Sequence, residues 1–89
     1  MLAQGMITVK DAATRAAEFA HITLDPTPQD LQLEEVELGK AGRIDAWLIT
    51  LSMPNRRLGS LGPREYKVFT VRGDTGEVIS MKIRELAHA

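Results

Sequence analysis

Apolar residues recur at helical spacing near the start of the chain. The spacing i, i+3, i+4, i+7, i+8 and i+11 places six of them on one face of a helix: Val9, Ala12, Ala13, Ala16, Ala17 and Ala20. This pattern predicts a helix over residues 6–21, with Thr8 as its N-cap. Pro26 and Pro28 lack the N–H that a longer helix needs, so the helix should end before them. Because most of the apolar face is alanine, we expect the helix to pack closely on its partner.

After residue 30 the pattern changes to the alternation of apolar and polar residues that is typical of β-strands. Four segments alternate in this way: Leu31 to Leu38, Ile44 to Met53, Glu65 to Arg72 and Glu77 to Leu86. In the first segment the alternation changes phase, because Leu31 and Leu33 face one way and Val36 and Leu38 the other. A bulge near Glu34 and Glu35 would bring all four side chains to one face.

Glycine-rich segments separate the four predicted strands. Residues 39–43 are expected to form a short loop, and residues 54–64 are expected to form a longer loop. In "GDTG", Asp74 and Thr75 suit the centre of a type I turn, and Gly76 suits the left-handed position that follows it. The third and fourth strands should therefore form a hairpin.

The order of these elements predicts an α+β fold, in which one N-terminal helix packs on a four-stranded antiparallel sheet with its strands in sequential order (α-β-β-β-β). Eighty-nine residues make a single domain, 1–89, and residues 87–89 are expected to be a frayed tail. The expected core is Val9, Ala13, Ala16, Ala20, Trp47, Ile49, Leu51, Phe69, Val71, Ile79, Met81 and Ile83.

The stretch "FTVRGDTGEVISMKI", preceded by a helix of pattern A-x-x-x-A, resembles PepSY-type domains. The resemblance extends over the helix, the strand around "WLITL" and the terminal hairpin. It implies a cystatin-like arrangement, with one helix lying across a curved antiparallel sheet. Members of the family are often secreted or membrane-tethered modules that regulate peptidases, and the family offers no catalytic residues to carry over.

Two features depart from the PepSY pattern. The family's D-x-x-T-G motif has aspartate where this chain has Arg72, and the loop of residues 54–64 is longer than a hairpin loop of the family. A divergent relative and convergence on the same shape both account for these differences.

Charge is divided unevenly along the chain, although the net charge is only −1. Residues 1–39 carry two Lys/Arg and seven Asp/Glu, whereas residues 40–89 carry nine and five. Such a division can steer a partner or orient head-to-tail self-association. Alternatively, the two halves are complementary neighbours within one fold.

Composition excludes several kinds of protein chemistry. The chain has no cysteine, which removes disulfides, thiolate metal sites and thiol catalysis. The start "MLAQGMITVKD" shows no signal peptide, and no apolar run approaches the length of a membrane span, so we expect a cytoplasmic protein.

Candidate catalytic residues are sparse. His21 suits the negative end of the helix dipole, His88 lies in the tail, and Glu34, Glu35 and Glu37 suit a solvated strand edge. We therefore expect no enzyme activity, no metal site and no cofactor.

Seven residues are the candidates for binding a partner: Arg56, Arg57, Leu58, Leu61, Arg64, Lys82 and Arg84. Leucines beside arginines in a loop suit a protein interface, unless Leu58 and Leu61 fold back over the sheet. The expected function is a non-enzymatic accessory or regulatory module that binds another protein, as an inhibitor or regulator, or binds itself as a homodimer. The alternative is a nucleic-acid-binding module that uses the basic loop and the outward face of the last strand.

Overall fold

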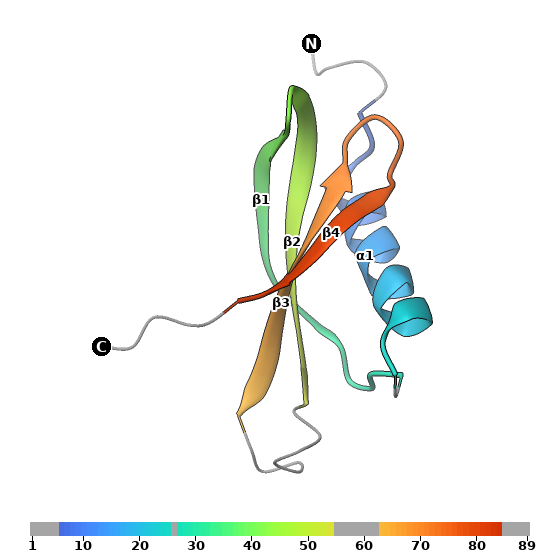
Figure 1. Ribbon diagram of the computed structural model, residues 1–89, viewed down its shortest axis with the longest axis vertical. Helices are drawn as coiled ribbons and strands as arrows, with labels where there is room; N and C mark the ends of the chain where they lie inside the picture. The colour runs from blue at the N-terminus through green and yellow to red at the C-terminus, as the bar shows by residue number, and fades with distance from the viewer. Residues whose placement is uncertain (1–5, 26, 55–62, 85–89) are drawn as a thin grey trace, which may run out of the picture.

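The computed structural model describes residues 6–25, 27–54 and 63–84. One helix precedes a sheet of four antiparallel strands in the order β1-β2-β3-β4 (Figure 1). The elements are α1 (Val9–Thr23), β1 (Gln32–Ala41), β2 (Ile44–Pro54), β3 (Arg64–Arg72) and β4 (Val78–Ile83). The α+β fold, its element order and the sequential strand order are those expected from the sequence.

The N-terminal end of α1 is anchored at two points. Thr8 is the N-cap, as predicted, and its hydroxyl accepts from the backbone N–H of Asp11 at 3.1 Å. Just before it, the N–H of Ile7 donates to the carbonyl of Gly73 (2.7 Å), and the indole N–H of Trp47 donates to the carbonyl of Ile7 (3.0 Å). These bonds tie the chain entering the helix to β2 and to the hairpin of β3 and β4.

The core lies between α1 and one face of the sheet, which we call the helix side. Its buried members are Ala12, Ala16, Ala20, Ile49, Leu51, Phe69 and Val71, and Trp47 and Met81 pack against them. The expectation was wrong for four residues. Val9, Ile79 and Ile83 are 39%, 45% and 69% exposed, and Ala13 is only partly buried and lies outside the core, to which Ala12 belongs instead. An irregularity between the pairs Thr70–Ser80 and Val71–Val78 leaves Ile79 unpaired and interrupts the predicted alternation.

β1 contains the predicted bulge and is longer than predicted. Its pairing with β2 shifts between Leu33 and Glu35, so Leu33 and Val36 lie on the same face. The predicted loop of residues 39–43 is wrong in length, since pairing continues to Ala41 and only Gly42 and Arg43 turn the chain. Gly42 has φ +65°, as the first position of a tight two-residue hairpin turn requires.

The turn between β3 and β4 holds an ion pair at the position where the resemblance would place an aspartate. Arg72 donates two hydrogen bonds to the carboxylate of Asp74, at 2.9 and 2.7 Å. These hydrogen bonds hold the pKa of the Asp74 carboxyl below its ordinary value. Gly76 takes the predicted left-handed conformation, with φ +79°.

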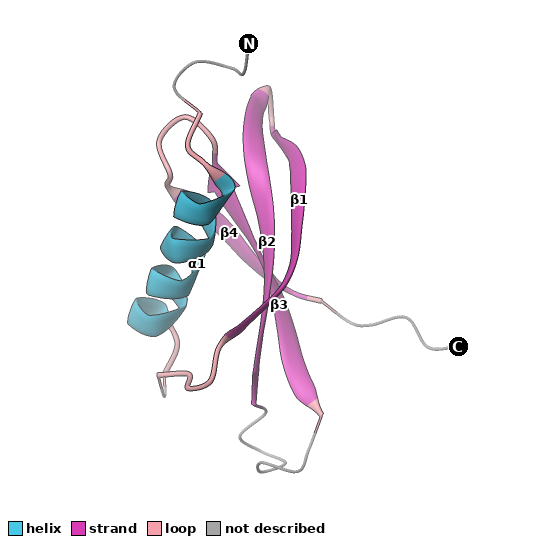
Figure 2. Cartoon of the chain, turned by 180° about the vertical axis from the view of Figure 1, so that it is seen from behind, coloured by secondary structure: helices cyan, strands magenta, loops and turns pink. Residues whose placement is uncertain are grey.

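The helix covers only part of the sheet. α1 contacts β2, β3 and β4, and β1 lies at the far edge of the sheet from the helix in both views (Figures 1 and 2). The first seven residues of β1 are all exposed, whereas five consecutive residues of β2 are buried. This uneven cover leaves the helix side of β1 open to solvent.

Candidate functional site

The structure describes three of the seven residues that the sequence marked for partner binding. Arg56, Arg57, Leu58 and Leu61 lie outside the described residues. Arg64 begins β3, Lys82 lies on β4 and Arg84 directly follows it. Lys82 pairs in register with Val68 and so lies on the outer face of the sheet, away from α1.

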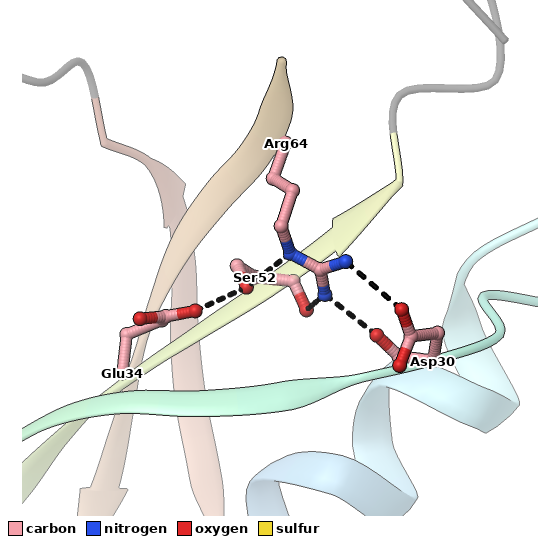
Figure 3. Close-up of polar contacts among 4 residues, drawn as sticks. All are labelled: Asp30, Glu34, Ser52 and Arg64. Carbon is pink, nitrogen blue, oxygen red and sulfur yellow. Dashed lines mark hydrogen bonds and ion pairs between the residues drawn. The ribbon is translucent and has the colours of Figure 1, made fainter. Parts of the chain in front are cut away.

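Arg64 is the centre of a polar network on the outer face (Figure 3). Its guanidinium donates to the hydroxyl of Ser52 (2.8 Å), to the backbone carbonyls of Ser52 (2.9 Å) and Asp30 (2.6 Å), and to the Asp30 carboxylate (3.0 Å). The fully buried Ser52 in turn donates to Glu34 at 2.6 Å. Arg64 therefore joins the segment before β1 to β2 and β3, and four of its five N–H groups donate to acceptors within the chain.

Replacing Arg64 with methionine is expected to lower the free energy of unfolding by about 2 kcal/mol, because the buried hydroxyl and carbonyl of Ser52 lose their charged donor. Urea unfolding of both proteins measures the difference. Lys40→Met is the matched control, since it removes an exposed ion pair with Asp45 (2.6 Å) and should cost about 0.5 kcal/mol. Equal losses in the two variants would contradict a structural role for Arg64.

Arg84 spans the outer face from one edge of the sheet towards the other. Its guanidinium pairs with Glu35 on β1 and donates to the buried hydroxyl of Thr50 at 3.3 Å. Beneath it lies a hollow of about 410 Å³ lined by Glu35, Glu37, Leu48, Thr50, Val68 and Arg84. The hollow has one cation and two carboxylates, so it is not a basic site.

The helix side of β1 carries a row of exposed apolar side chains, which we call the β1 strip: Leu33, Val36 and Leu38. Their exposed fractions are 53%, 37% and 58%. They pair in register with Leu51, Ile49 and Trp47, which α1 covers or which pack against the core. The strip thus continues the apolar surface of the core beyond the edge of the helix.

Among the residues that the structure describes, no strand pairs with the outer edge of β1, so the backbone beside the β1 strip is also open. β1 is an edge strand, and alternate residues of an edge strand direct their N–H and C=O groups away from the sheet. From Glu35 to Ala41 the pairing of β1 with β2 is regular, without a further shift. A seven-residue backbone edge therefore lies next to exposed apolar side chains, and an extended polypeptide can bond to such an edge.

The β1 strip was not among the residues that the sequence marked as a site. The alternation and the bulge correctly placed its three side chains on one face. The alternation of apolar residues along β1 did not indicate that α1 would leave that face uncovered. A single helix before four strands was the one available signal, because a helix about 10–12 Å wide cannot cover a four-stranded sheet.

Comparison with protein-family models, with curated proteins and with solved structures gave no match. Within residues 6–25, 27–54 and 63–84, no helix is long and apolar enough to cross a membrane. The same residues contain no group of three His, Asp or Glu side chains placed to hold a metal ion. The β1 strip and its edge are the features on which a function can be argued.

Proposed function

We propose that this chain is a non-enzymatic cytoplasmic accessory domain that binds a polypeptide through β1 and thereby regulates or inhibits it. The observation that carries the proposal is the β1 strip, where Leu33 and Leu38 are 53% and 58% exposed beside an open backbone edge. Apolar side chains next to unpaired backbone groups suit the addition of a strand from a partner. Burial of the apolar side chains and pairing of the backbone groups would together stabilise the complex, and neither requires a catalytic group.

A protein partner suits the described surface better than a nucleic acid does. Arg64 and Arg84 are already paired with Asp30 and Glu35. Glu37 stands beside Glu35 on the outer face, where it would repel a phosphate backbone. The proposed PepSY resemblance agrees with a binding role, because members of that family are often modules that regulate peptidases.

Site-specific photo-cross-linking in the cells that make the protein tests the proposal. A photoreactive residue at position 36, within the β1 strip, should form adducts with a polypeptide that mass spectrometry identifies. The same residue at position 22 is the matched control, since Ile22 is apolar and 82% exposed but lies on α1. Because both positions are exposed, neither substitution should unfold the domain.

The adducts distinguish the proposed function from its alternative. A discrete polypeptide adduct at position 36 that is absent at position 22 would support binding through β1. Equal adducts at the two positions, or none, would refute it. Adducts at position 36 that shift in size after nuclease treatment would replace it with the nucleic-acid function.

A further inference from the structure

The regular part of β1 is symmetric about Leu38. It begins at Glu35, directly after the bulge, and ends at Ala41, where the chain turns into β2. Leu38 lies three residues from each end. When an edge strand pairs with its own copy in antiparallel fashion, one residue lies on the two-fold axis and faces itself. All seven residues of the regular segment, 35–41, pair with the second copy only if the residue on the axis is Leu38.

We propose that the chain forms a homodimer in which β1 pairs with β1 of a second copy, with Leu38 facing Leu38 across the two-fold axis. The two sheets then join into one sheet of eight strands, with both α1 helices on the same side. This inference rests on the proposed binding role of β1 and names the partner as a second copy of the chain. It also closes the edge that β1 otherwise exposes.

Charge on the outer face disfavours the registers whose axis lies nearer the bulge, at Glu37 or Val36, whereas an axis at Gly39 would leave only residues 37–41 of the regular segment paired. With Leu38 on the axis, Glu37 faces Gly39 and Glu35 faces Ala41 of the second copy, so each carboxylate meets a small residue. Moving the axis to Glu37 places two Glu37 carboxylates directly opposite each other, and moving it to Val36 places Glu35 opposite Glu37 twice. Like charges directly opposite across a strand pair are destabilising.

The helix side gains apolar contact in the same register. The two Leu38 side chains, 58% exposed in one chain, lie directly opposite each other. Val36 faces Lys40 of the second copy, whose aliphatic stem can cover it while its ammonium group stays paired with Asp45. The β1 strips of the two copies therefore meet in the middle of the joined sheet.

The other edge of the sheet is less suited to pairing. β4 is six residues long, and the irregularity at Ile79 leaves only Ser80 to Ile83 in regular pairing. Pairing of β1 with β4 of another copy would match acidic and basic side chains, but Arg84 is already held by Glu35 of its own chain. Such head-to-tail pairing also builds open-ended assemblies of many copies rather than dimers.

Sedimentation of the purified protein and single-cysteine cross-linking test the dimer and its register. The chain has a mass of 9.8 kDa and no cysteine, so each introduced cysteine reports one position. In Leu38→Cys the two Cα atoms should lie about 4.5–5.5 Å apart, within the range for a disulfide. In Val36→Cys the two copies of residue 36 lie four residues apart along the strands, about 13 Å, which is too far.

We expect a dimer by sedimentation, and upon mild oxidation a disulfide-linked dimer of Leu38→Cys but not of Val36→Cys. Leu38→Asp should raise the dissociation constant at least about tenfold, whereas Ile22→Asp should leave it unchanged. Only monomer up to about 1 mM, cross-linking at residue 36 instead of 38, or assemblies larger than a dimer would each overturn the inference. A monomer that still gives polypeptide adducts at position 36 in cells would overturn the dimer and leave the proposed function standing.

Discussion

Replacing Phe69 with alanine is expected to lower the free energy of unfolding by about 4 kcal/mol. Phe69 is fully buried, lies between Ile49 and Met81 on the neighbouring strands, and meets the ring of Phe19 edge-on at a centroid distance of 6.2 Å. Alanine leaves a cavity between helix and sheet that no neighbour can fill. Because small domains are stable by only about 5–15 kcal/mol, the variant should lose a large share of its stability.

Urea unfolding followed by circular dichroism measures the effect of Phe69→Ala. Val68→Ala is the matched control, since Val68 is the next residue of β3 but lies half-buried on the outer face. It should cost about 1 kcal/mol. If Phe69→Ala cost no more than Val68→Ala, α1 could not pack over β3 as described.

Replacing Ala16 with leucine is expected to lower the free energy of unfolding by about 3 kcal/mol. Ala16 is fully buried in the middle of α1 and belongs to the same core as Phe69 and Ile49. Three added carbon atoms would push the helix away from the sheet. Alanine and leucine have nearly equal helix propensities, so the loss reports packing rather than helix formation.

Thermal unfolding of Ala16→Leu and of Thr14→Leu separates packing from helix propensity. Thr14 lies on the exposed side of α1, so leucine there should change stability by less than about 0.5 kcal/mol. An Ala16→Leu protein as stable as Thr14→Leu would show that the alanine face does not set the distance between helix and sheet.

Most of the fold could be predicted from the sequence because its signals are local. The alanine stripe, the N-cap at Thr8, the bulge beside Glu34 and the left-handed Gly76 each depend on residues close together in the chain, and each is found in the structure. Ile79 was misplaced because an irregularity in β4 breaks the alternation without a glycine or a repeated polar residue to mark it.

The candidate site could be predicted less well, because it depends on contacts between distant segments. Arg64 was counted as a free cation, and its partner Asp30 lies 34 residues earlier in the chain. Likewise Arg84 pairs with Glu35, 49 residues away. Neither partner follows from spacing, so the sequence overstated the basic character of the outer face.

The β1 strip is exposed because a four-stranded sheet is wider than a single helix. The outermost strands of a four-stranded sheet lie about 14 Å apart, which exceeds the diameter of a helix of about 10–12 Å. One helix must therefore leave an edge strand uncovered. The alternation of β1 alone could not show that β1, rather than β4, would be that strand.

The position of α1 before all four strands also affects how the protein folds during synthesis on the ribosome. α1 leaves the exit tunnel before any of the strands β2, β3 and β4 that it contacts. An isolated helix of 15 residues with an alanine face is only marginally stable in water. We therefore expect the nascent helix to fluctuate until the hairpin of β2 and β3 has been synthesised and gives it a surface on which to dock.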